Sequence, residues 1–256
     1  MKILACLKQV PEKDSRYEIR ADGSWIRNED LSFDASEPDE YGLEEALRLK
    51  EKQGGEVILL SIGPERVEKM IRKGLAMGAD RAVLARVEGR RLDAHLTARV
   101  IAAVAKQEQA DLVITGIQSD DIGLVQTGAV AAEMLGWPHV TLVMGVEVLE
   151  GGTLKVQREM ENGWLENSEI PLPAVLAIQS GISQIRYASL KGIMAAKKKE
   201  VRKVSADELI AGDSARLAIG KVMFPPAGKK AEIVPGTPKE AAAALVDKLK
   251  REAKVL

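Results

Sequence analysis

The chain has 256 residues, 46% of them hydrophobic, which is enough for one large globular domain or two small ones. Its 37 basic residues nearly balance its 38 acidic residues, so the sequence predicts no general affinity for nucleic acid or for an anionic membrane surface. No apolar run approaches the roughly 20 residues of a membrane-spanning helix, and we expect no membrane insertion.

The few cysteines, histidines and aromatic residues further limit the chemistry. Cys6 is the single cysteine and cannot form an internal disulfide, and two histidines are too few for a His/Cys metal cage. The first apolar run is interrupted at Lys8, too early for the core of a signal peptide. We therefore expect no metal site and a reducing, cytoplasmic or matrix-like location. Because only 3% of the residues are aromatic, a flavin bound here would need walls from a partner.

Short apolar runs alternate with longer amphipathic segments along the first two thirds of the chain. Strands are predicted at residues 3–7, 57–61, 82–84, 112–115 and 174–178. Helices are predicted at residues 39–52, 64–77, 92–107, 129–135 and 239–254. Continuous apolar strands separated by helices are typical of a parallel sheet that is covered on both faces. The predicted fold class is therefore α/β with a mainly parallel sheet and flanking helices.

The last third of the chain has a different character. Residues 146–149 and 153–156 flank a Gly-Gly pair and predict a β-hairpin insertion. Prolines then punctuate residues 224–238, ahead of the final amphipathic helix. We expect a nucleotide-binding α/β domain at residues 1–200 and an extended C-terminal arm at residues 201–256 that docks on another protein.

The most informative segment, residues 115–128, joins a predicted buried strand to a predicted helix. A loop rich in glycine and hydroxyl groups at this position offers backbone N–H groups and the positive end of a helix dipole to a phosphate. Taken alone, the loop fits equally well a strand that ends at Gly116 and a helix capped by residues 119–121. It matches neither the G-x-G-x-x-G fingerprint nor the phosphate loop of ATPases.

Several separated stretches resemble the beta subunits of electron transfer flavoproteins, in the same order along the chain. They are Lys8-Gln9-Val10-Pro11, residues 39–46, residues 75–82, the loop with its acidic pair and Gln126-Thr127-Gly128, residues 156–163, residues 172–175, and residues 186–199. The resemblance covers nearly the whole chain, and the ordered set of motifs is far more specific than any one of them.

The resemblance implies a Rossmann-like domain of the adenine nucleotide alpha hydrolase-like type, which packs beside an alpha subunit. In this family FAD is held mainly by the alpha subunit, and the beta subunit commonly buries AMP. Electrons pass from a dehydrogenase, such as an acyl-CoA dehydrogenase, to a quinone reductase or another acceptor. The beta subunit is then an electron carrier subunit and not an enzyme, which agrees with the lack of any catalytic constellation in the sequence.

The resemblance also predicts which residues contact the nucleotide. They are Cys6, Ser36, Glu37, Pro38, Asp39, Ile62, Gly116, Gln118, Ser119, Asp120, Asp121, Ile122, Gly123, Leu124, Val125, Gln126 and Thr127. The family often has Asn-Pro where this chain has Ser36-Glu37, and more polar residues in place of Leu124 and Val125. We therefore expect contacts through the backbone there, and no redox role for Cys6.

A dehydrogenase-facing contact is predicted in residues 163–171, interpreted as a polar loop. In relatives the equivalent loop inserts an apolar side chain into the partner. In this chain the polar residue Ser168 lies near the position expected for that apolar side chain. Trp164 or Leu165 would therefore be the anchor, since large apolar residues are favoured at interface hot spots. The alternative is that Trp164 folds back onto residues 153–156 as part of a small satellite core.

Two other functions remain open at this point. One is the beta subunit of an electron-bifurcating flavoprotein with a second FAD in place of AMP. The corresponding loop of that branch usually has an Asp-Thr pair and ends in Val-Gly-Pro. This chain instead has Leu124-Val125 followed by Gln126-Thr127-Gly128-Ala129, so AMP is favoured over a second FAD. The other is a universal-stress-type regulatory domain that binds an adenine nucleotide. It would not explain Leu172-Pro173, Arg186-Tyr187 or the proline-rich tail.

Overall fold

A central nine-stranded sheet organises the chain in the computed structural model, which describes residues 1–226, 228 and 231–256. In spatial order the strands are β11 (Val201–Ser205), β5 (Arg81–Arg86), β4 (Glu56–Gly63), β1 (Lys2–Cys6), β6 (Leu112–Gly116), β10 (Ala174–Ile178), β7 (His139–Val148), β8 (Thr153–Glu159) and β9 (Leu165–Pro171). Neighbours from β11 to β7 pair in parallel, and β7, β8 and β9 pair antiparallel. The fold class is the predicted one, a mainly parallel α/β sheet of Rossmann-like form.

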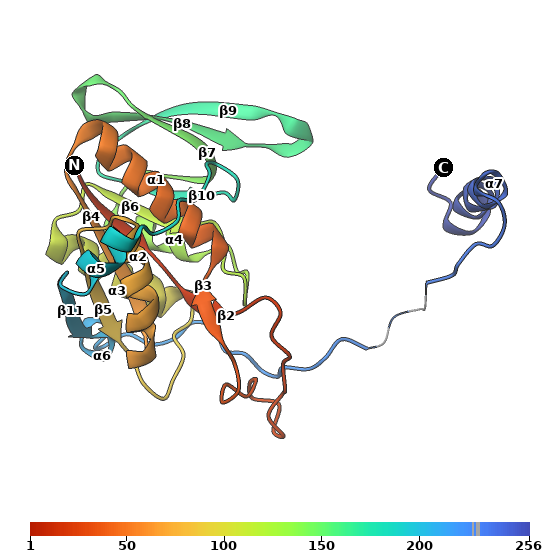
Figure 1. Ribbon diagram of the computed structural model, residues 1–256, viewed down its shortest axis with the longest axis horizontal. Helices are drawn as coiled ribbons and strands as arrows, with labels where there is room; N and C mark the ends of the chain where they lie inside the picture. The colour runs from red at the N-terminus through yellow and green to blue at the C-terminus, as the bar shows by residue number, and fades with distance from the viewer. Residues whose placement is uncertain (227, 229–230) are drawn as a thin grey trace.

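Helices cover both faces of this sheet (Figure 1). Residues of α1 (Glu37–Gln53) and α2 (Glu68–Met77) belong to the core on one face, and residues of α3 (Ala94–Glu108) and α4 (Thr127–Leu135) belong to the core on the other. The remaining helices are α5 (Leu190–Ala196), α6 (Ala206–Leu209) and α7 (Pro238–Lys248). A separate two-stranded sheet contains β2 (Gln9–Pro11) and β3 (Phe33–Ala35).

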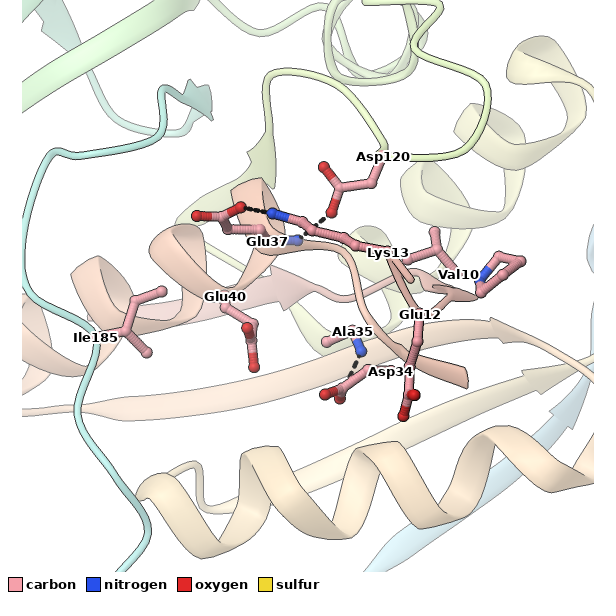
Figure 2. A pocket seen from close by; sticks show the side chains of 10 residues that line it. Val10, Glu12, Lys13, Asp34, Ala35, Glu37, Glu40, Asp120 and Ile185 are labelled. Atoms are coloured by element: carbon pink, nitrogen blue, oxygen red, sulfur yellow. Dashed lines mark hydrogen bonds and ion pairs between the residues drawn. The ribbon is translucent and has the colours of Figure 1, made fainter. Parts of the chain in front are cut away.

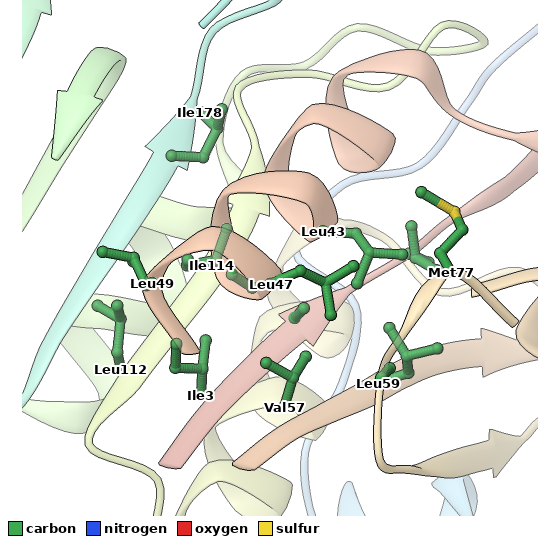
Figure 3. Packing of buried hydrophobic residues seen from close by; sticks show 14 of the residues in the cluster. Ile3, Leu43, Leu47, Leu49, Val57, Leu59, Met77, Leu112, Ile114 and Ile178 are labelled. Carbon is green, nitrogen blue, oxygen red and sulfur yellow. The ribbon is translucent and has the colours of Figure 1, made fainter. Parts of the chain in front are cut away.

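The uninterrupted apolar strands are explained by burial on both faces. Ile3 and Ala5 of β1 point into the core beneath α1 and α2, whereas Leu4 between them points into the core beneath α3 and α4, and all three are fully buried. Figure 3 shows Leu43 and Leu47 of α1 directed at the same side of the sheet as Ile3. Every residue of such a strand buries apolar surface, which is the dominant favourable term in folding.

The predicted strands and main helices are confirmed, with small shifts at their ends. Residues 65–67 form a 3-10 turn, so the helix predicted from residue 64 begins as α2 at Glu68. The prediction of a loop at residues 163–171 is wrong, because Leu165–Pro171 is the edge strand β9, paired along its whole length with β8. Its mixed composition hid it, since an edge strand has one exposed face and one open side.

The C-terminal part of the chain runs along the α/β body after α6 and leaves it beyond residue 222. The strand β11 pairs with β5, so residues 201–205 still belong to the sheet. Beyond them the chain is extended, and Figure 1 shows α7 lying away from the body. None of the residues of α7 is buried, and Leu245 and Val246 are about half exposed. No helix within the described ranges is long and apolar enough to cross a membrane.

Candidate functional site

The candidate site lies where the carboxyl ends of β1 and β6 meet. From β1 the chain moves outward through β4 and β5, and it then returns to place β6 on the other side of β1. Such a reversal separates the loops that follow the two strands and opens a crevice in which α/β proteins bind ligands. The loop predicted to hold the nucleotide, residues 116–127, follows β6 at this point.

A buried carboxylate joins the two strand ends. Asp39, in the first turn of α1, accepts hydrogen bonds from the backbone N–H groups of Gly116 and Lys8, both at 2.8 Å. Burial raises the pKa of Asp39 to about 7, although these two hydrogen bonds and the charge of Lys8 favour its ionised form. A Cβ on Gly116 would lie 2.7 Å from Asp39 Oδ1 and 2.7 Å from the carbonyl carbon of Pro38. Glycine is therefore required for the contact.

The side chain of Lys8 also holds the loop at residues 116–127. Its Nζ donates to Ser119 Oγ at 3.1 Å and to Asp121 Oδ1 at 2.6 Å. Burial alone would raise the pKa of Asp121, but the charge and hydrogen bond of Lys8 keep it below its usual value. A cationic side chain thus lies at the loop, although its charge is shared with Asp121.

Two further hydrogen bonds connect the loop to the start of α1. The N–H of Asp120 donates to Ser36 Oγ at 3.1 Å, and the N–H of Glu37 donates to Asp120 Oδ2 at 2.8 Å. Residues 36–39 and 116–121, predicted as separate parts of one site, are thus directly bonded to each other. The loop caps α1, which has no cap from its own Ser36 side chain.

The N-terminus of α4 has the features of an anion site. Its N-cap residue, Gln126, makes no capping hydrogen bond, so the first N–H groups of α4 have no side-chain acceptor in the described part of the chain. Beside it, Thr115 Oγ1 is buried and lacks a hydrogen-bond partner among the described residues. A Cβ on Gly128 would approach this oxygen to 2.7 Å. By contrast, the N-cap side chains of α3, α5, α6 and α7 do cap their helices, at Asp93, Ser189, Ser205 and Thr237, whereas those of α1 and α2 do not.

These features fit a phosphate group. The uncapped N–H groups lie at the N-terminus of α4, where the positive end of the helix dipole favours an anion. The buried Thr115 hydroxyl is a further donor, and leaving it without a hydrogen bond costs free energy. The loop before α4 also holds two residues in the left-handed region, Gly123 with φ of 62° and Val125 with φ of 57°. For a β-branched residue this conformation is strained, and such strain is concentrated at ligand sites.

The remaining predicted contacts provide apolar surface or are exposed. Cys6 and Ile62 are partly buried at the carboxyl ends of β1 and β4, on the side of the sheet that carries α3 and α4. Burial, with a smaller effect from Asp39, raises the pKa of the Cys6 thiol, so it stays protonated at neutral pH. The exposed side chains of this loop include Gln118, Ile122, Leu124, Val125 and Gln126.

A cleft of about 300 Å³ adjoins this site but differs from it in chemistry (Figure 2). Its lining comprises Val10, Pro11, Glu12, Lys13, Asp34, Ala35, Glu37, Glu40, Asp120 and Ile185. Lys13 forms an ion pair with Glu37, and Lys73 pairs with Asp34 and Glu40 at the edge of the cleft. Acidic side chains outnumber basic ones, so this cleft does not suit a phosphate.

The residues predicted to contact a dehydrogenase lie on the β8–β9 hairpin. Trp164 is 74% exposed and Leu165 is 50% exposed, while Ser168 pairs with Val156 within the strands. The alternative that Trp164 packs onto residues 153–156 is wrong, because Leu165 is paired with Glu159 at the far end of β8.

Sequence reasoning missed a second exposed apolar surface, around α5. Tyr187 is 97% exposed, Leu190 84% and Met194 63%. The segment is held firmly, because Arg186 makes hydrogen bonds at 2.8 and 2.9 Å to the buried Glu44 of α1. Leu190 and Met194 are four residues apart, and this helical spacing in a basic segment was the signal available in the sequence.

Comparisons with known proteins agree on one family. The family model described as "Electron transfer flavoprotein domain" matches residues 25–209. The chain is 39% identical to "Electron transfer flavoprotein subunit beta" of Methylophilus methylotrophus, over 96% of this chain and 97% of the relative. Proteins of the same name from Bradyrhizobium diazoefficiens (39% identity, 100% of both chains) and Homo sapiens (36%, 91% and 93%) are similar over nearly their full lengths.

Proposed function

The chain belongs to the electron transfer flavoprotein family as a beta subunit, and from this premise we propose that it is the AMP-binding half of a heterodimeric electron carrier. Its alpha partner would hold most of the FAD, which carries the electrons. The heterodimer would take electrons from an acyl-CoA or related dehydrogenase and deliver them to a quinone reductase or another acceptor. The universal-stress-type alternative is set aside by the family match.

One observation carries the nucleotide assignment: the uncapped α4 N-terminus lies beside the Thr115 hydroxyl, which has no hydrogen-bond partner among residues 1–226, 228 and 231–256. In the proposed complex these groups hold the AMP phosphate, with backbone N–H groups of 123–127 around it. Residues 36–39 and Lys8 order the loop through the hydrogen bonds described above, and Cys6 and Ile62 supply apolar surface for the adenosine part. The chain's own residues bind and orient the nucleotide and transfer no proton.

Nucleotide analysis of the heterodimer tests this assignment. The protein is purified with its alpha partner, denatured, and the released nucleotides are identified and counted by chromatography. One FAD and one AMP per heterodimer are expected. Two FAD and no AMP would refute the AMP assignment and support the bifurcating alternative.

Two glycines of similar conformation provide a residue-level test. Gly123 has φ of 62° and Gly136 has φ of 68°, at opposite ends of α4, and neither has an atom within 3.4 Å of where a Cβ would lie. Gly123→Val and Gly136→Val should therefore both strain the backbone and lower the melting temperature. Only Gly123→Val should also reduce the AMP content. Equal AMP in both variants would argue against this loop as the phosphate site.

For dehydrogenase binding we retain Trp164 and Leu165 as the proposed anchor, and the exposed surface around α5 is the competing candidate. Trp164→Ala with Leu165→Ala should raise the KM of the dehydrogenase for this carrier about tenfold, which corresponds to about 1.4 kcal/mol. Flavin content and melting temperature should not change, because both side chains are exposed. If Tyr187→Ala with Leu190→Ala raises the KM instead, the contact lies on α5 and the hairpin assignment fails.

The C-terminal arm is proposed to bind the alpha subunit. Apolar side chains are exposed along it at Leu217, Ile219, Met223, Phe224, Ile233, Leu245, Val246, Val255 and Leu256. So much exposed apolar surface in one extended segment is typical of an interface. The heterodimer gives this surface an occupant, since the relatives are named as subunits.

A further inference from the structure

One carboxylate, Asp93, is shared between a helix of the body and the first part of the C-terminal arm. Its Oδ1 accepts a hydrogen bond of 2.9 Å from the N–H of Leu96 and so caps α3. Its Oδ2 accepts from the N–H groups of Arg216 and Leu217, at 2.6 and 3.0 Å. The donors on Oδ2 are more than 120 residues away in sequence, so the arm crosses the start of α3 at this point.

The arm is held at two more places close by. On one side of this point, His95 Nε2 lies 3.0 Å from Asp213 Oδ2. On the other side, the N–H of Val222 donates to the carbonyl oxygen of Gly23 at 2.8 Å. The stem of Lys221 packs so closely on Gly23 that a Cβ there would lie 3.0 Å from its Cγ and Cε atoms. Residues 213–222 are thus attached to the body, whereas Met223 and Phe224, which follow directly, are 64% and 63% exposed.

The choice of aspartate is explained by the arm and not by the helix. Ser, Asn and Asp are about equally good N-cap residues, since one acceptor oxygen is enough. Only a carboxylate has acceptors on both oxygens, and it can therefore accept from α3 and from the arm together. Partial burial alone would raise the pKa of Asp93, but the three backbone N–H groups lower it below the usual value, so the carboxylate is ionised at neutral pH.

We propose that Asp93 is a positioning residue for subunit association: by fastening residues 216–217 to the start of α3, it sets the direction in which the arm leaves the body toward the alpha subunit. This inference rests on the proposed binding of the arm to that subunit. Because residues 213–222 are already ordered on the body, the arm loses less conformational freedom when the rest of it binds. Asp93 acts through the arm and needs no contact with the partner.

The test uses heterodimers that carry Asp93→Asn or Asp93→Ser. Both residues keep an N-cap oxygen for α3, but neither can accept on both sides, so the melting temperature should be nearly that of the wild type. We expect the dissociation constant between the subunits to rise about tenfold, the equivalent of about 1.4 kcal/mol. Amide hydrogen exchange at Arg216 and Leu217 should become faster. If Asp93 served only to cap α3, its substitution would not change the exchange rate at these two residues.

Two control variants separate the possible failures. Ser205→Ala removes the cap of α6, because Ser205 Oγ accepts from the N–H of Glu208, and this hydrogen bond does not involve residues 213–222. It should leave the dissociation constant unchanged. Leu245→Ser with Val246→Ser alters α7 alone and should weaken association. If the α7 variant weakens association but the Asp93 variants do not, the inference about Asp93 is overturned and the proposed role of the arm stands. If neither the α7 variant nor the Asp93 variants weaken association, both are overturned.

Discussion

Helices α1 and α7 carry similar amphipathic patterns but lie in opposite environments. Leu43 of α1 is 1% exposed in the core against the sheet, whereas Leu245 of α7 is 48% exposed. The isolated position of α7 is not due to weak helix signals, because Thr237 and Glu240 form a capping box and Pro238 begins the first turn. Local signals are therefore enough to form a helix, whereas burial of its apolar face needs a partner surface, which α1 finds within the chain.

The largest effect should come from removing a buried side chain of α1. Leu43→Ala leaves a cavity between α1 and α2, where Leu43 Cδ2 lies beside Gly74. We expect a loss of about 4 kcal/mol in the free energy of unfolding, measured by urea denaturation. A loss below about 1 kcal/mol would mean that the α1 face of the core is far less closely packed than the structure indicates.

A smaller but still large effect is expected where α1 meets the candidate site. In Gly116→Ala the new methyl group would collide with backbone atoms of Pro38 and Asp39, which cannot move freely. We expect a loss of about 3 kcal/mol in stability, together with loss of bound AMP. Gly145→Ala is the control, because its Cβ would meet Gln157 only at 3.4 Å. Equal stability of the two variants would contradict the close contact between β6 and α1.

The pH dependence of stability should reveal the Asp39 carboxylate. Burial raises its folded-state pKa from 3.8 to about 7, so between these values the folded chain binds more protons than the unfolded chain. Asp39 therefore makes stability fall as pH rises from about 4 to 7, by up to about 1.4 kcal/mol per pH unit, and this slope disappears above about 7. Asp39→Asn should remove this slope in denaturation curves recorded across the range. Parallel slopes for the variant and the wild type would show that Asp39 does not titrate there.

The smallest effect on stability is expected in α7. Leu245→Ala with Val246→Ala removes side chains that are already half exposed, so the free energy of unfolding of the chain should change by less than about 0.5 kcal/mol. The same variant should weaken binding to the alpha subunit, measured by sedimentation of the mixed subunits. A stability loss like that of Leu43→Ala would mean that α7 packs on its own chain.

Elements whose signals are local could be predicted from the amino-acid sequence. Ile3, Leu4 and Ala5 read as a strand buried on both faces because neighbouring residues point to opposite faces of a sheet, and both faces are covered here. The glycines of the loop after β6 and the helix that follows it are adjacent in the chain, so the sequence alone could nominate this loop as a candidate phosphate site. The family resemblance rested in the same way on short contiguous motifs, and the comparisons confirm it.

Features that depend on residues distant in sequence became visible only in the folded chain. Asp39 and Gly116 are 77 residues apart, and nothing near either one indicates that they bond. The strand β9 is defined by its register with β8, which a mixed polar sequence does not encode. The second acceptor oxygen of Asp93 acquires its role only when residues 216–217 return to α3. Such contacts form because the compact fold brings the groups together, and local propensity carries no trace of them.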